Sequence, residues 1–455
     1  MNQVDLINLG EKAIKQMQKD GIDQSEFCII KSREISIEIE RGSIKYSKEM
    51  TDFGCSIRAI KNGCLGFSFT TSITPKSISQ LIKRVEKLAK VGLQDPDFKS
   101  LPIPKKIPQV YGTYDSNIAN LDVFEAVELI LDLLDYAIID KRIHSINSSL
   151  NCSYEQTFIM NSLGVEAIEE NKNGHTSITI YAEITAKQGQ EMSSGFEFQN
   201  GRFIKEINVE KIGKNAAKLA IDSLGAKNIK TCELPIVFHP IALYNIFSTA
   251  IGNAVNAESI QYGRSYFMDK INKEIAIKNF EVKDDGTYIK NGIAGLGTSA
   301  FDGEGTPQQK TQVIKKGILK NYLHNSYTAG KANIESTGNA SRGNFRRIPT
   351  ISPTNLIIKP DNGNIDNLIS ETKNGILVIW TGDRPNLATG EFSGLIGAGF
   401  KIENGEIAFP LKQTMIGINM LDFFQRIDRI GNDLRQISHI ITPSIRINKG
   451  KIGGK

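Results

Sequence analysis

The stretch of residues 301–327 constrains the fold of this chain more than any other part of it. It opens with Asp302 and Glu304 set between glycines, which suits a loop that backbone or ligand approaches closely. Two short β-prone runs then flank a turn at 315–317, a pattern that predicts a β-hairpin. We therefore predict a polar, glycine-rich loop carried on a stiff hairpin, a common way for a fold to present functional groups. An ordinary surface loop is the alternative on these residues alone.

Length and charge limit the class of protein. At 455 residues the chain exceeds one typical domain, so two or three domains are expected. The net charge of +5 is small for this length, and basic residues are interleaved with acidic ones. This distribution argues against a protein dedicated to nucleic acid.

No targeting or membrane segment is evident. The first residues lack a basic region followed by an apolar core, so they do not form a signal peptide. No apolar run approaches the roughly 20 residues that span a bilayer. A cytoplasmic protein without membrane contact is expected. The 5 cysteines are scattered and never spaced as CxxC, which indicates neither a disulfide framework nor a thiol-rich zinc site.

The periodicity predicts an α+β fold class: N-terminal two-layer α/β units followed by a mainly-β C-terminal domain with a few packed helices. Residues 1–94 read as an α+β domain, with a helix starting at Thr74-Pro75 and a hairpin at Asn62-Gly63. Residues 95–108 are proline-rich and read as an extended linker.

Two further domains follow the linker. Residues 109–230 read as a central α+β domain with a helix at 123–139. Residues 231–455 read as the mainly-β domain, with a buried helix at 241–255. The tail 448–455 is rich in glycine and lysine, so we expect it to be frayed.

Familiar catalytic motifs are absent from the sequence. The glycines at 295–297 do not open a helix, as a dinucleotide site would require. There is no P-loop, and Ser393 is offset by one position from a GxSxG pattern. No two of the 5 histidines lie within six residues of each other, whereas zinc chemistry usually needs two ligands on one helical face. A zinc site assembled from distant residues stays open at this point, but nothing in the pattern motivates it.

Carboxylates in glycine-rich context are the other candidates for chemistry. These are Asp284 with Asp285, Asp302 with Glu304, and Glu391. Acid–base work by such a pair would require an environment that separates their pKa values. Solvated turn acids are one interpretation. Carboxylates that bind a peptide backbone or a partner subunit are the other interpretation.

Seven short segments form a recognisable series along the chain: residues 284–286, 301–307, 314–323, 336–340, 389–393, 402–407 and 430–433. They occur in the same order in the TldD/PmbA proteins, and the chain resembles that family along essentially its whole length. The match looks closest to the PmbA (TldE) branch.

The resemblance implies a zinc metallopeptidase assembly of two related subunits that acts on unfolded peptides or peptide precursors. In the TldD branch an HExxxH helix and a later cysteine hold the zinc. In this chain the corresponding helix, 241–255, has no histidine, and no cysteine follows Cys232. The resemblance therefore implies a non-catalytic subunit that holds no metal or other cofactor itself, with zinc on a TldD-like partner.

A subunit without a metal site would position the substrate, through loops that contact the peptide or the partner subunit. The predicted contact residues are Asp302, Glu304, Thr306, Asn339, Arg342, Glu391 and Ser393. The partner is a TldD-like subunit or a second copy of this chain. A stand-alone, divergent metallopeptidase is one alternative. A peptide-binding or assembly module without protease activity is the other.

Overall fold

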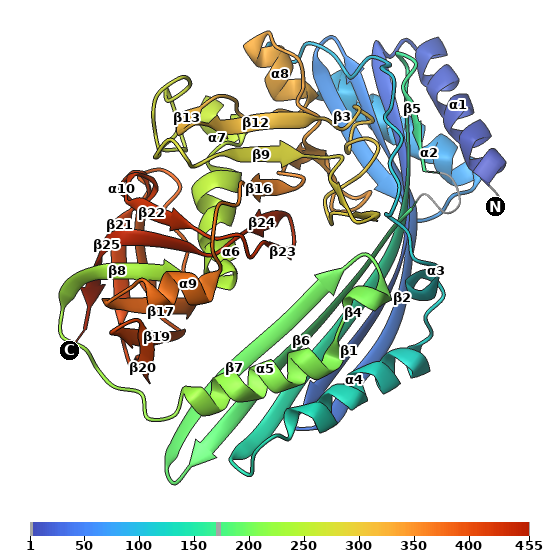
Figure 1. Cartoon of the computed structure of the whole chain (residues 1–455). Helices are drawn as coiled ribbons and strands as arrows, with labels where there is room; N and C mark the ends of the chain where they lie inside the picture. Colours follow the sequence, from blue (N-terminus) through green and yellow to red (C-terminus); the bar gives the residue numbers. More distant parts are fainter. Residues whose placement is uncertain (1–2, 170–173, 455) are drawn as a thin grey trace.

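One long, twisted sheet forms the N-terminal half of the molecule (Figure 1). The computed structural model describes residues 3–169 and 174–454. Residues 1–2, at the start of the segment that we predict not to be a signal peptide, and Lys455, at the end of the predicted frayed tail, lie outside the described residues. The strand order is β3-β2-β1-β4-β6-β7, with β5 beside β4. The bounds are β1 Gln24–Glu40, β2 Ser43–Lys61, β3 Cys64–Thr70, β4 Ile143–Asn161, β5 Glu166–Ile168, β6 His175–Gln188 and β7 Glu191–Gly201.

This sheet is continuous across the first two predicted units. Strand β1 of the first unit pairs antiparallel with β4 of the second, from Glu26 opposite Asn161 to Ile39 opposite Ser148. Residues 95–108 contain neither helix nor strand. Within this segment Leu101 is buried, and its N–H donates to Gln24 Oε1 at 2.8 Å. The segment therefore packs along the sheet, and the exact domain boundaries stay predictions.

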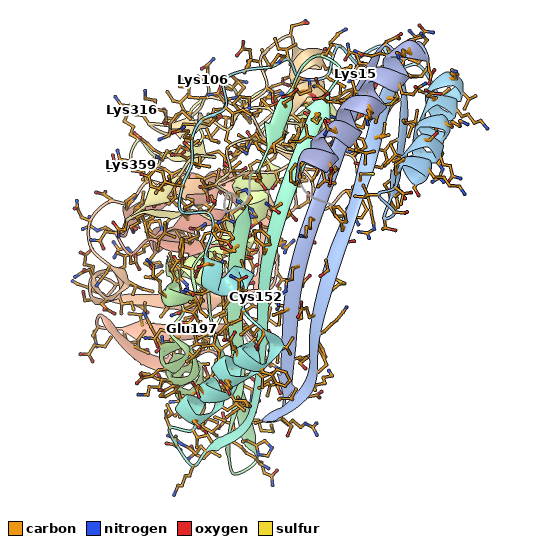
Figure 2. The ribbon with its side chains drawn as sticks, turned by 90° about the vertical axis from the view of Figure 1, so that its right-hand side faces the viewer. Lys15, Lys106, Cys152, Glu197, Lys316 and Lys359 are labelled. Atoms are coloured by element: carbon orange, nitrogen blue, oxygen red, sulfur yellow. The ribbon has the colours of Figure 1, made fainter. Side chains whose placement is uncertain are left out.

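Helices cover one face of the sheet at both of its ends (Figures 1 and 2). The odd-numbered apolar residues of β1 share that face, since side chains alternate along a strand. Phe27 and Ile29 pack under α1 (Gln3–Lys19) and α2 (Pro75–Val91). Ile35, Ile37 and Ile39 pack under α4 (Val123–Ala137) and α5 (Val209–Asp222), near the short α3 (Ser116–Ala119). The predicted start of α2 is confirmed, because the Thr74 side chain accepts a hydrogen bond from the N–H of Ser77.

The C-terminal domain contains two larger sheets. The first has the order β18-β21-β25-β8-β17-β19-β20, with β22 beside β25, and the second has the order β13-β12-β9-β16-β24-β23. The bounds in the first are β8 Cys232–Phe238, β17 Asn374–Trp380, β18 Glu391–Leu395, β19 Ala398–Glu403, β20 Glu406–Pro410, β21 Met415–Asn419, β22 Ile427–Ile430 and β25 Ile445–Gly453. The bounds in the second are β9 Val282–Asp285, β12 Lys310–Lys315, β13 Ile318–Leu319, β16 Leu356–Ile358, β23 Arg435–Ile437 and β24 Ile440–Thr442.

A central helix packs against both of these sheets. It comprises α6 (Pro240–Phe247) and a π-helix (Ser248–Asn253), and one core cluster joins its apolar residues to strands of both sheets. Small two-stranded pairs join β10 (Ile289–Lys290) to β11 (Ile293–Ala294) and β14 (Ala340–Ser341) to β15 (Thr350–Ile351). The remaining helices are α7 Ala257–Gln261, α8 Ser326–Ala332, α9 Ile365–Ser370 and α10 Met420–Gln425. The predicted α+β class with a mainly-β C-terminal domain is confirmed.

Two local predictions in this domain have opposite outcomes. The hairpin is confirmed: Ile314 pairs with Leu319, and the turn places Lys316 and Gly317 at positive φ. The prediction that the tail 448–455 is frayed is wrong, because β25 lies between β8 and β21 in the sheet. Ile452 is fully buried there, and apolar packing together with strand pairing outweighs the flexible composition of the tail.

The C-terminal domain lies against the sheet face opposite the helices. The even-numbered residues Cys28 and Ile30 of β1 pack there with Phe301 and Phe345 of the C-terminal domain. We call this contact the junction. No helix in the described part of the chain is both long and apolar enough to cross a membrane.

Candidate functional site

A buried network of charges crosses the junction. Glu26 of β1 and Arg58 of β2 pair with each other, and Arg58 Nη1 donates to Glu304 Oε1 at 2.9 Å. Arg342 Nη2 donates to Glu26 Oε1, which also accepts from Arg58, and Arg342 Nε donates to the Gly303 carbonyl at 2.6 Å. The four charged side chains are at most 8% exposed. Although burial alone would raise it, Arg342 and Arg58 hold the pKa of Glu26 below its usual range.

Asp302 shapes the glycine-rich loop from within. Its carboxylate accepts hydrogen bonds from the backbone N–H groups of Glu304, Thr306 and Ala340, at 2.9, 2.9 and 3.0 Å. Burial, and then the charge of Glu304, raises the pKa of Asp302 to about 7, while these N–H groups oppose the rise. A solvated surface loop is therefore the wrong interpretation for Asp302 and Glu304, since both side chains are buried in intrachain contacts.

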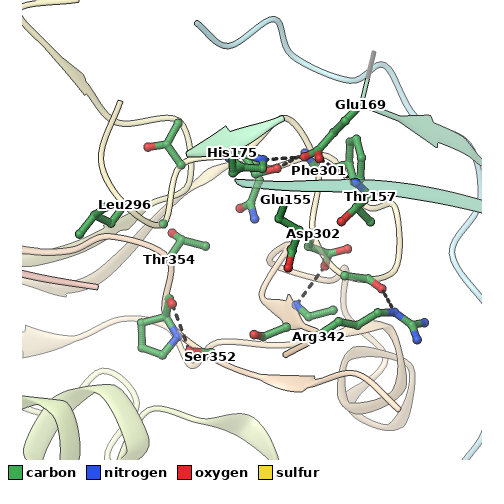
Figure 3. A pocket seen from close by; sticks show the side chains of 18 of the residues that line it. Glu155, Thr157, Glu169, His175, Leu296, Phe301, Asp302, Arg342, Ser352 and Thr354 are labelled. Atoms are coloured by element: carbon green, nitrogen blue, oxygen red, sulfur yellow. Dashed lines mark hydrogen bonds and ion pairs between the residues drawn. The ribbon is translucent and has the colours of Figure 1, made fainter. Parts of the chain in front are cut away.

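A cavity of about 280 Å³ opens at the junction beside this loop (Figure 3). Glu155, Glu169 and His175 line it from the sheet, and Asp302 and Arg342 line it from the C-terminal domain. We call it the junction cavity. It brings two of the predicted contact residues together with three titratable side chains that the sequence analysis did not select. Those three lie in or beside regular strands, where no motif distinguishes them from ordinary solvent-facing polar residues.

The charged groups of the junction cavity perturb one another. His175 Nε2 lies 2.5 Å from Glu169 Oε1. Burial, and then the charge of Glu169, raises the pKa of Glu155 to about 7, while Arg202 opposes the rise. Arg202 is itself buried and donates to the carbonyl oxygens of Thr176, Gly295, Leu296 and Thr298. These hydrogen bonds place carbonyl dipoles around the charge of Arg202, and they attach the loop 295–298 to the sheet.

Asn339 and Thr306 lie close to the same loop. Asn339 Nδ2 donates to Asp284 Oδ2 at 2.7 Å and to the Ser352 carbonyl at 3.1 Å. Burial raises the pKa of Asp284 to about 6. The Thr306 N–H binds Asp302, whereas its buried hydroxyl has no hydrogen-bond partner in the described chain. Asn339 therefore ties segments of the C-terminal domain together.

Glu391 and Ser393 belong to a different surface. Both are exposed on β18, which forms one edge of the eight-stranded sheet. The carbonyl of Glu391 accepts from Asn386 N–H at 2.8 Å, and the N–H of Leu395 donates to Asp383 Oδ2 at 2.7 Å, both outside the β21 ladder. Because backbone groups alternate along a strand, the N–H and carbonyl of Ser393 point the same outward way. Segment 383–386 therefore already contacts this outer edge on both sides of Ser393, and the N–H and carbonyl of Ser393 between these contacts have no partner among the described hydrogen bonds.

The type and spacing of side chains on the central helix decide whether this helix can hold a zinc ion. The two histidines of HExxxH stand five positions apart, which is the hydrogen-bond spacing of a π-helix. Inside the π-helix only Ser248 and Asn253 have this spacing, and neither is a zinc ligand. His439 lies near it, with Nε2 3.9 Å from the Cβ that an alanine at Gly252 would carry.

The other histidine near this helix serves its structure. His239 caps α6 through Nδ1, which accepts the N–H of Ile241 at 3.2 Å, and burial lowers the pKa of His239 to about 4. Across residues 3–169 and 174–454, no cluster of three or more His, Cys, Asp or Glu side chains is arranged to hold a metal. The donors present do not fit zinc.

A second cavity, of about 490 Å³, lies between β6, β7 and α6. We call it the aromatic cavity. Its walls include Tyr181, Phe196 and Trp380, together with Ile241 and Tyr244 of α6. It therefore lies beside the helix on which the metal motif would fall.

Three consecutive segments match family models. Residues 26–89 match "PmbA/TldA metallopeptidase domain 1", residues 116–224 match the "central domain" and residues 231–454 match the "C-terminal domain" of the same series. An uncharacterized protein of Methanocaldococcus jannaschii is 30% identical over 443 residues, covering 97% of this chain and 99% of that protein. A "Metalloprotease TldD homolog" of Buchnera aphidicola is 28% identical, covering 87% and 83%. The crystal structure of TldE from Thermococcus kodakarensis has a TM-score of 0.90 at 23% identity, covering 98% and 100%.

Proposed function

Because the chain belongs to the PmbA/TldD metallopeptidase family, we propose that it is the non-catalytic, PmbA/TldE-like subunit of a zinc peptidase assembly that acts on unfolded peptides or peptide precursors. The observation that carries the proposal is the π-helix. Its hydrogen-bond spacing equals the spacing of the two histidines in HExxxH, but Ser248 and Asn253 stand at the two positions with that spacing. Without imidazole ligands, this helix cannot activate a water molecule on a metal.

The subunit contributes a surface that holds the peptide. An extended substrate meets the edge of β18 at Ser393, with main-chain hydrogen bonds to its outward N–H and carbonyl, between the two contacts made by segment 383–386. Main-chain pairing is independent of side-chain identity, which suits an assembly that processes unfolded chains of varied sequence. Asp302, Glu304, Asn339 and Arg342 act indirectly, by fixing the junction and the loop at its edge.

The proposed partner is a TldD-like subunit that carries the zinc site, with a second copy of this chain as the alternative partner. Support comes from the family itself, whose members include proteins named as TldD metalloproteases and a protein named TldE. A cytoplasmic location stays a prediction.

The deciding experiment compares the purified chain alone with the chain co-expressed with an HExxxH-bearing relative. Zinc content and cleavage of an unfolded peptide are measured in both preparations. We expect less than stoichiometric zinc and no cleavage for the chain alone, and chelator-sensitive cleavage for the pair. Chelator-sensitive cleavage by the lone chain would identify a stand-alone metallopeptidase instead. Peptide binding without cleavage in either preparation would identify a binding or assembly module.

A further inference from the structure

The aromatic cavity contains three rings, of which the middle one, Phe196, contacts the other two. Tyr181 of β6 and Phe196 of β7 are stacked, with ring centroids 6.4 Å apart. Trp380, at the end of β17, meets Phe196 edge to face at 5.7 Å. The sheet and the C-terminal domain thus both contribute to one aromatic surface.

The backbone holds Trp380 in position. The pairing of β17 with β19 shifts register between Val378 and Trp380, and such bulges re-aim the side chain that follows. The indole ring presses on Gly397, where a Cβ would lie 2.2 Å from it, and Gly382 lies close to its other edge. Trp380 is nevertheless 37% exposed. A large aromatic side chain that is fixed in place and still open to solvent is suited to receive a ligand.

A carboxylate stands beside these rings. Glu183 lies directly opposite Phe196 in the β6–β7 register, and it lines the same cavity. Burial, and then the charge of Glu183, raises the pKa of Tyr181 to about 12. Within the described residues, the Glu183 side chain has neither an ion-pair nor a hydrogen-bond partner. The cavity therefore combines aromatic faces with a carboxylate that has no ion-pair partner among the described residues.

We propose that the aromatic cavity binds the cationic side chain of a lysine or arginine in the peptide. This inference rests on the proposed peptide-binding function and specifies its preference. Aromatic faces attract a cation, a carboxylate completes its charge and hydrogen bonding, and the aliphatic stem packs along the rings. Since Ile241 and Tyr244 of α6 line the same cavity, a side chain bound there holds the peptide alongside the central helix.

The emission of Trp380 provides the test, because it is the only tryptophan in the chain. The full chain is titrated with two tryptophan-free, unfolded peptides that differ at one position, lysine in one and norleucine in the other. Norleucine keeps the aliphatic stem and removes the charge. We expect the lysine peptide to change the emission and to bind about tenfold more tightly than the norleucine peptide. Glu183→Gln is expected to remove most of this preference while leaving the norleucine affinity unchanged.

Glu128→Gln provides the matched control, since it removes one negative charge from the exposed surface of α4 and is expected to keep the preference. Equal affinity for both peptides, tighter binding of norleucine, or an unchanged preference in Glu183→Gln would overturn the inference. Binding seen by anisotropy of a labelled peptide without any change in Trp380 emission would also overturn it, and would leave the proposed function standing. Absence of peptide binding even in the co-expressed pair would count against both.

Discussion

Arg342 of the C-terminal domain binds the carboxylate of Glu26 in the first strand, across a separation of 316 residues in sequence. Both side chains are nearly excluded from solvent, at 2% and 1% exposure. Glu26 also holds Arg58, which in turn binds Glu304, so that two acids and two bases alternate across the junction. A buried network of this kind is costly to break at any member, because the remaining charges stay desolvated.

The first prediction concerns this network. Replacing Arg342 by Met removes one of the two cations that compensate Glu26, and we expect the free energy of unfolding to fall by about 3–5 kcal/mol. Urea unfolding followed by circular dichroism measures the loss. As a control, Arg429→Met breaks an exposed pair with Glu371 and should cost less than about 1 kcal/mol. Similar losses in the two variants would contradict a special role for the junction.

The second prediction concerns pH and the junction cavity. The pKa of Glu155 is raised to about 7 in the folded chain, so the folded state binds the proton more tightly than the unfolded state does. Ionised Glu155 therefore destabilises the fold at pH 8, and this penalty disappears as the pH falls below about 5. Glu155→Gln should be more stable than the wild type by about 1–3 kcal/mol at pH 8, and the difference should shrink toward pH 5.

Unfolding in urea at the two pH values measures this difference. Exposed Glu128→Gln should show the same small effect at both values. A Glu155→Gln variant that is less stable than the wild type at pH 8 would show that Glu155 is compensated by a group outside the described contacts.

The third prediction concerns the edge of β18. Ser393→Pro removes the outward N–H that the proposed peptide strand uses, and we expect peptide affinity in the co-expressed pair to fall by about tenfold. Methylation of single backbone nitrogens in the peptide should reproduce this loss at the position that pairs with Ser393, without any change in the protein. Glu406→Gln, exposed on β20 at the opposite edge of the same sheet, should bind normally. A uniform effect of methylation along the peptide would argue against strand pairing.

The fourth prediction tests the geometry of the π-helix. Ser248→His combined with Asn253→His places two imidazoles five positions apart on one face, close to His439. We expect this double variant to bind Co²⁺ with the absorption bands of nitrogen ligands, and to lose most of the affinity when His439→Ala is added. Equal binding with and without His439 would exclude it as the third ligand.

The fifth prediction concerns the hairpin that carries the glycine-rich loop. Gly317 has φ of 75°, and a Cβ there would lie 2.2 Å from the Ala276 carbonyl oxygen. Gly317→Ala should therefore lower the free energy of unfolding by about 1–3 kcal/mol, measured by urea unfolding. Gly343→Ala offers a matched control, because nothing lies within 4 Å of the Cβ position there. A neutral Gly317→Ala would mean that the turn relaxes freely.

Local chemistry explains what the sequence by itself determined. The hairpin at 310–319, the capped start of α2 at Thr74 and the apolar helix at 240–253 depend on neighbouring residues, and each was predictable. The lack of histidine in that helix is also a property of the sequence alone. Together with seven segments in family order, these features suffice to recognise the family.

Tertiary structure decided which distant side chains meet. Strand β1 joins two predicted units into one sheet, and β25 orders a tail whose composition predicts fraying, because pairing partners far along the chain supply the hydrogen bonds and the burial. Glu155 and Glu183 look like ordinary strand residues until other segments place a charge or an aromatic ring beside them. Electrostatic environment and burial are properties of the folded neighbourhood, so the pKa of Glu155 and the aromatic cavity emerge only in three dimensions.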